Sequence, residues 1–128
     1  MSESIAIISD IHANLPALEA VLADIESQGI RELLFLGDVV GYGAQPAECI
    51  ELLRSKSFMT ILQGNHDAYT ASEVDPLNVS PETLEGIRWT RARLSPEHRA
   101  WLGALPLTWQ GSDCEAVHAA LPNPEAWD

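Results

Sequence analysis

The stretch Ser4-Ile-Ala-Ile-Ile-Ser9 is a short apolar run rich in β-branched residues, and this composition is typical of a buried strand. Two similar runs follow, at residues 31–36 and 58–62. Between the three runs, apolar residues recur at helical spacing, first from Asn14 to Gly29 and then from Pro46 onward. The order βαβαβ predicts parallel strands with helices covering the sheet. We therefore expect an α/β fold for the first sixty residues.

The second half of the chain carries different signals. Residues 70–79 are polar and are predicted to be irregular. Ser80-Pro-Glu82 and Ser95-Pro-Glu97 each combine a helix cap, a first-turn proline and an acidic residue, which predicts two further helices. Residues 105–110 and 113–117 are predicted to form a strand pair around Gly111-Ser112. Because no linker or repeat interrupts the pattern, residues 1–128 are expected to form a single domain.

The composition limits the classes of partner. The chain has 128 residues, 46% of them hydrophobic, with 19 acidic and 7 basic side chains and a formal charge of −12. This charge opposes binding to nucleic acid or to anionic lipid. No export signal or membrane-spanning run is visible. Cys49 and Cys114 lie in apolar stretches without Cys-x-x-Cys spacing, so we expect buried free thiols and a cytoplasmic protein with no membrane partner.

Polar side chains follow four of the predicted strands. Asp10 and His12 come after the first strand, Asp38 after the second, Asn65 after the third and His118 after the last. In open α/β sheets ligands bind beyond the carboxyl ends of the strands, so residues far apart in sequence are expected to meet along one edge.

Each of these residues has an ordinary structural explanation when taken singly. Asp10 or Asp38 can form a turn or cap the next helix, Asn65 can be a turn residue, His66 can be exposed, and His118 can be a hydrogen-bonded core histidine. Their joint occurrence at four strand ends favours a metal site. Asp, Asn and His ligands suit Mn, Fe, Zn, Co or Ni better than Ca, and a carboxylate that bridges two such ions indicates phosphate-ester chemistry.

The motif series resembles that of the calcineurin-like metallophosphoesterases. The matching segments are Asp10-Ile-His12, Gly37-Asp-Val-Val-Gly-Tyr-Gly43, Gly64-Asn-His-Asp67 and Val117-His118-Ala119. The resemblance implies a layered α/β/β/α sandwich, which we expect to be incomplete at the C-terminus, and two divalent metal ions, of which Mn is the one we expect to serve in vitro. It also implies hydrolysis of a small phosphate monoester or diester by a metal-bridging hydroxide.

The resemblance also assigns roles to individual residues. Asp10 and His12 would bind one metal, Asn65 and His118 the other, and Asp38 would bridge them. His66 would contact the phosphate and protonate the leaving oxygen. The chain is similar to small prokaryotic phosphoesterases rather than to serine/threonine protein phosphatases.

The chain departs from the family at several positions. Protein phosphatases carry Asp and Arg where this chain has Gly41 and Tyr42, and Arg where it has Gln63. The change at Gly41 removes the usual partner of the catalytic histidine, and the other two remove phosphate-clamping guanidinium groups.

The family's later Gly-His-x-His segment is also absent, which leaves each metal one histidine short and predicts uncovered apolar sheet surface. His98 does not match that segment and is expected on a helix surface. An alternative is therefore a catalytically weak or inactive remnant that binds metal or a partner. A second copy of the chain, or a missing C-terminal segment, would then complete its site.

Overall fold

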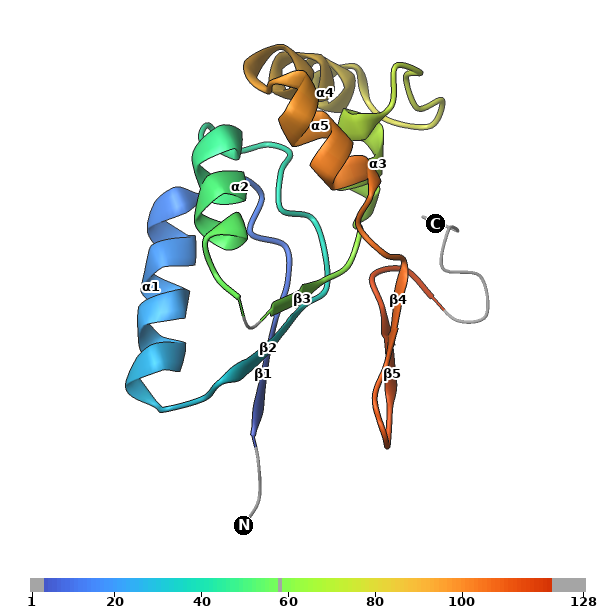
Figure 1. Ribbon diagram of the computed structural model, residues 1–128. Coiled ribbons are helices and arrows are strands. Elements are labelled where there is room, and N and C mark those ends of the chain that lie inside the picture. The colour runs from blue at the N-terminus through green and yellow to red at the C-terminus, as the bar shows by residue number, and fades with distance from the viewer. Residues whose placement is uncertain (1–3, 58, 121–128) are drawn as a thin grey trace.

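The computed structural model describes residues 4–57 and 59–120 (Figure 1). The elements in chain order are β1 (Ile5–Ile8), α1 (Leu15–Ser27), β2 (Glu32–Phe35), α2 (Pro46–Arg54), β3 (Met59–Ile61), α3 (Asn65–Ala71), α4 (Pro81–Arg93), α5 (Pro96–Gly103), β4 (Thr108–Gln110) and β5 (Glu115–Val117). Strands β1, β2 and β3 form a parallel sheet in that order, and β4 pairs with β5 in an antiparallel hairpin. The predicted α/β fold with a βαβαβ unit is confirmed.

Helices α1 and α2 cover one face of the parallel sheet, while the β4–β5 hairpin lies on its other side and α3, α4 and α5 pack beyond one end (Figure 1). The core lies between the two helices and the sheet, where Leu18, Phe35 and Ile50 are fully buried. Their burial follows from the predicted spacing, because alternate residues of each strand meet the apolar stripes of both helices.

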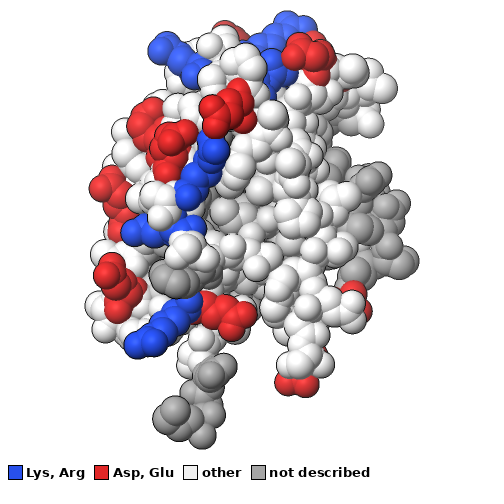
Figure 2. All heavy atoms as spheres, viewed as in Figure 1, with Lys and Arg blue, Asp and Glu red and all other residues white. Residues whose placement is uncertain are grey.

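The opposite face of the sheet is only partly covered. Ile5 and Ile7 of β1 keep 36% and 60% of their surface exposed, whereas Leu34 of the neighbouring strand is buried. Figure 2 shows charged side chains mainly over the helices at the left and top, with an uncharged region between them and the hairpin. The expected uncovered apolar surface is therefore present along β1.

Two helix caps agree with the sequence, since the side chains of Asn14 and Ser80 accept hydrogen bonds from the backbone N–H groups of Ala17 and Thr83. The prediction of irregular structure from residue 70 was wrong at its start, because α3 extends to Ala71. That helix was not predicted. Its seven residues are too few to show a helical apolar period, and its capping acid, Asp67, lies inside a motif that suggested a turn.

Two expected surface properties were also wrong. Cys114 is a free thiol as expected but is exposed, because it lies at the tip of the short hairpin rather than in a core strand. His98 is half-buried, and its Nε2 lies 2.8 Å from Glu51 Oε1, so it joins α5 to α2. Within residues 4–57 and 59–120, no helix is both long and apolar enough to cross a bilayer.

Candidate metal centre

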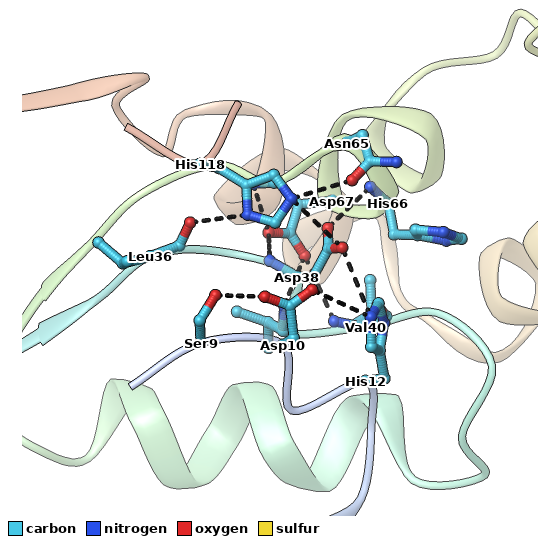
Figure 3. Close-up of polar contacts among 12 residues, drawn as sticks. Ser9, Asp10, His12, Leu36, Asp38, Val40, Asn65, His66, Asp67 and His118 are labelled. Carbon is cyan, nitrogen blue, oxygen red and sulfur yellow. Dashed lines mark hydrogen bonds and ion pairs between the residues drawn. The ribbon is translucent and has the colours of Figure 1, made fainter. Parts of the chain in front are cut away.

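The loops after the parallel strands β1, β2 and β3, together with the end of hairpin strand β5, bring the five predicted metal ligands together (Figure 3). Asp10, Asp38 and His118 offer ligand atoms that lie within 4.8 Å of one another. His12 Nε2 lies 3.4 Å from Asp10 Oδ1 and 3.5 Å from Asp38 Oδ2. The side-chain amide of Asn65 lies 3.0 Å from His118 Nε2, and with its nitrogen turned toward Asp38 it donates to Oδ2 at 3.1 Å. Asp38 is the central residue of the cluster, because its carboxylate lies close to the side chains of the other four ligands.

The two histidines of this cluster are oriented by backbone carbonyls. His12 Nδ1 donates to Val40 O at 3.0 Å, and His118 Nδ1 donates to Leu36 O at 2.9 Å. Each ring therefore turns its Nε2 toward Asp38 Oδ2, at 3.5 Å for His12 and 3.4 Å for His118. A metal-binding histidine commonly donates its second N–H in this way, which fixes the ring and its tautomer. The donor set thus fits divalent cations.

Backbone strain is concentrated in the same loops. Asp10, His12 and Asp38 have φ values of 56°, 47° and 62°, and the other two non-glycine residues with positive φ among those described, Ala13 and Tyr42, are their neighbours. Such values are uncommon for residues with a side chain and cluster at functional sites. Hydrogen bonds hold the loops together, since Asp10 N donates to Gly37 O at 2.9 Å and His12 N to Asp38 O at 3.0 Å.

Asp67 ties the loop after β2 to the loop after β3. Its side chain is fully buried and accepts four backbone N–H groups. The donors are Asp38 at 2.8 Å, Val39 at 2.9 Å, Val40 at 3.3 Å and Gly64 at 2.9 Å. Burial raises the pKa of Asp67 to about 7 against the effect of these bonds. Because all four neighbours are donors, the ionised carboxylate is the form that satisfies them.

The sequence places Asp67 in the Gly64-Asn-His-Asp67 motif but does not indicate a role for it. Its position three residues after Gly64, at the start of a helix, was the available signal, because an acid there can accept N–H groups at the helix start.

The backbone at Gly64 lies against Asp38. A Cβ atom at this position would come within 2.2 Å of Asp38 Oδ1 and 2.3 Å of Asp38 N. Two residues further on, the backbone N–H of His66 donates to Asp38 Oδ1 at 2.9 Å. This close approach of two backbones requires a residue without a side chain, and it places Asn65 beside Asp38.

The charges at the centre of the cluster are coupled. Burial opposes ionisation of Asp38, but the hydrogen bond and charge of His118, together with the His66 N–H, outweigh it and lower the pKa of this carboxyl. The hydrogen bond to Asp38 raises the pKa of His118 to about 9, in spite of partial burial. Two carboxylates and an imidazole in this arrangement attract a positive charge, whether a proton or a metal ion.

The chain's similarity to known proteins agrees with this cluster. The family profile for calcineurin-like phosphoesterases matches residues 3–127. The chain belongs to this family. Membership implies divalent metal ions as cofactors, and the α/β fold and the positions of the motifs agree with it.

Three individual proteins illustrate the relationship. An uncharacterized protein of Methanocaldococcus jannaschii is 39% identical over 97% of this chain and 52% of its own length. A symmetrical bis(5'-nucleosyl)-tetraphosphatase of Coxiella burnetii is 30% identical over 91% of this chain and 41% of its own. The crystal structure of a metallophosphoesterase from Sphaerobacter thermophilus superposes with a TM-score of 0.71 at 37% identity, covering 90% of this chain and 46% of that one. The chain therefore spans about half the length of the relatives it matches.

His66, the family's candidate acid, lies beside the ligands rather than among them (Figure 3). It is 6% exposed and is surrounded by the rings of Tyr42, His12 and Tyr69, with ring centroids 4.6, 5.2 and 5.6 Å away. Burial lowers its pKa. Among the described residues, none hydrogen-bonds to its Nδ1. A Cβ atom at Gly41 would lie 2.6 Å from that nitrogen, so the position where the phosphatases carry Asp is filled here by the histidine itself.

Gln63, which stands where the protein phosphatases of the family carry an arginine, has a structural contact instead. Its Nε2 donates to Leu102 O at 2.9 Å, and its backbone N–H donates to Pro106 O at 2.8 Å. The residue thus attaches the end of β3 to the end of α5. Its side chain is committed to a backbone carbonyl and supplies no substitute for the missing guanidinium group.

A cavity of about 460 Å³ lies at the opposite end of the sheet. Its lining includes Leu22, Ile25, Leu33 and Met59, together with Arg31. None of the predicted site residues borders it, and its lining is mainly apolar. The polar chemistry of the chain is therefore at the carboxyl ends of the strands.

Proposed function

We propose that this chain carries the metal-binding core of a phosphoesterase that hydrolyses small phosphate monoesters or diesters with two divalent cations. The observation that carries the proposal is the pair of imidazoles around Asp38. His12 and His118 each donate Nδ1–H to a backbone carbonyl and direct Nε2 to the same carboxylate oxygen, at 3.5 and 3.4 Å. A carboxylate flanked in this way suits a bridge between two ions.

In this proposal Asp10 and His12 hold one cation, Asn65 and His118 hold the other, and Asp38 lies between them. When bound, the cations would polarise the phosphoryl group and activate water for attack on phosphorus. Most of the basic residues have partners away from the cluster, so the cations would also supply the positive charge that phosphate binding needs.

The proposed role of His66 is to donate a proton to the leaving oxygen. Burial lowers the pKa of its imidazole in the chain without substrate. The negative charge of a bound phosphate would favour the protonated form again. The ring lies close enough for this role, because its backbone N–H bonds to Asp38 Oδ1 and its ring contacts that of His12.

The test uses two readouts on the 128-residue chain. After loading with Mn²⁺ and dialysis, elemental analysis is expected to find close to two metal ions per chain, and the loaded chain is expected to hydrolyse a nitrophenyl phosphate ester. Asp38→Asn should lose both properties, because it removes the negative charge of the central group. Asp113→Asn, an exposed residue of the hairpin, is the matched control for charge and should keep both. Hydrolysis that survives Asp38→Asn would refute the proposal.

A second function is favoured by the uncovered β1. The exposure of Ile5 and Ile7 and the half-length match to the relatives suit a chain that binds metal weakly and depends on a partner. In that case a second copy or a further segment would cover β1 and supply additional ligands. Light scattering discriminates between the two, since a monomer that binds two metal ions tightly would need no such partner.

A further inference from the structure

Tyr42 stands at the border of the candidate metal centre and is largely in solvent. Its side chain is 67% exposed. Its ring centroid lies 4.6 Å from that of His66 and 5.1 Å from that of His12. It therefore contacts both a proposed metal ligand and the proposed acid, while most of its surface remains available to a molecule that enters the site.

The backbone holds Tyr42 in an unfavourable conformation. Its φ is 63°, and the Gly43 N–H donates to Gly41 O at 2.7 Å, which closes a three-residue turn with Tyr42 at its centre. A γ-turn with positive φ is rare and strained, and a bulky side chain makes it less favourable than glycine would. Burial of the ring contributes little stability to offset this strain, because Tyr42 is largely exposed. Strain of this kind at a site suggests a use for the side chain.

Most of the basic side chains of the chain interact with residues outside the candidate metal centre. Arg54 pairs with Glu97, Arg88 and Arg91 pair with Asp75, and Arg99 pairs with Glu73. Arg93 lies over the Trp89 ring, and Arg31 and Lys56 line the cavity at the far end of the sheet. All seven Lys and Arg residues are thereby accounted for. Most basic side chains are therefore not available to hold the non-phosphate part of a substrate, and Tyr42 offers a large aromatic surface for it.

We propose that Tyr42 is a specificity-determining residue whose ring stacks on a planar aromatic group in the esterified part of the substrate. The site would then select phosphates of nucleosides or of aryl alcohols over phosphates of aliphatic alcohols. This inference rests on the proposed function, because it assumes that the metal centre holds the phosphate. Stacking of a base on an aromatic side chain contributes about tenfold or more to affinity.

The test compares two ligands that differ only in a base. AMP and ribose 5-phosphate both carry a phosphate on the ribose 5-oxygen, and their dissociation constants for the Mn²⁺-loaded chain can be measured by calorimetry. We expect AMP to bind about tenfold more tightly than ribose 5-phosphate. Tyr42→Ala should reduce this preference to about one by weakening AMP binding alone. Tyr42→Phe keeps the ring and should keep the preference. Phenyl phosphate, compared with ethyl phosphate, tests whether a simple aryl group suffices.

Three results would overturn the inference. They are equal binding of AMP and ribose 5-phosphate by the unaltered chain, a loss in Tyr42→Phe as large as in Tyr42→Ala, and binding of neither ligand. The second would indicate that the phenol hydroxyl, rather than the ring, is used. Thermal unfolding of each variant checks that the exposed residue can be replaced without loss of the fold. If AMP binds with the expected preference and no ester is hydrolysed, the proposed catalysis fails while the role of Tyr42 stands.

Discussion

Replacing Asp67 with asparagine tests whether this carboxylate holds the site together. Oδ2 accepts from the N–H groups of Asp38 and Gly64, and Oδ1 accepts from those of Val39 and Val40. In Asp67→Asn one of these oxygens becomes an NH₂ group, so two buried N–H donors lose their acceptor and face another donor. Hydrogen bonds to a charged group contribute about 1.5–3 kcal/mol each. Since relief of the buried charge offsets part of the loss, we expect destabilisation of about 3 kcal/mol.

The assay is urea unfolding of the metal-free chain, followed by tryptophan fluorescence. A loss of about 3 kcal/mol is a large share of the roughly 5–15 kcal/mol that stabilises a domain, so the variant is expected to be folded only at low urea. Mn²⁺ affinity measured below the transition should fall about 10–100-fold, as for other residues that orient metal ligands. Asp113→Asn removes the same charge from an exposed position and should change neither quantity. An unfolding free energy for Asp67→Asn within about 0.5 kcal/mol of the unaltered chain would refute the reasoning.

Two further predictions concern the same loops. Gly64→Ala should lower the unfolding free energy by about 1–3 kcal/mol and weaken Mn²⁺ binding, because its Cβ would lie 2.2 Å from Asp38 Oδ1. Gly86→Ala is the control and should stabilise the chain slightly, because the Cβ position in α4 faces open space. Thermal unfolding that ranks the two variants in the reverse order would contradict this. In EDTA, the unfolding free energy should decrease by on the order of 2 kcal/mol as the pH rises from 6.5 to above 9, because the pKa of His118 is raised to about 9 and the protonated form stabilises the fold. His118→Asn should flatten that dependence in urea titrations, and an equal slope in the variant would show that the imidazole is not its source.

Most of the sheet could be predicted because its strands and helices have strong local signals. The apolar run at residues 5–8 and the cap at Asn14 each specify their element without help from distant residues. Helix α3 could not be predicted in this way. Its start depends on Asp67 accepting the Gly64 N–H, and its end is held by Arg91, which donates to Tyr69 O at 2.8 Å across 22 positions in sequence. Long-range bonds of this kind leave no periodic trace in the sequence.

Four of the five candidate ligands, all but His118, follow the parallel strands, which bring their carboxyl ends to one edge, whereas His118 follows a strand of the antiparallel hairpin. What the sequence could not predict is the arrangement around them. The carbonyls that orient His12 and His118 come from Val40 and Leu36, and any residue type could supply a backbone carbonyl. The lack of a carboxylate partner for His66 Nδ1 among the described residues agrees with the prediction from Gly41, which stands where the protein phosphatases carry Asp.

The backbone, more than the ligands themselves, determines the geometry of this site. Asp10, His12 and Asp38 all have positive φ, and the loop that contains Asp38 is fixed by the buried carboxylate of Asp67. A cation therefore need not organise these loops when it binds. The hydrogen bond to the carboxylate of Asp38 raises the pKa of His118 to about 9, which favours a positive imidazolium beside that carboxylate. Backbone hydrogen bonds thus define the shape of this strained, acidic site, and the neighbouring imidazole of His118 balances the charge of Asp38.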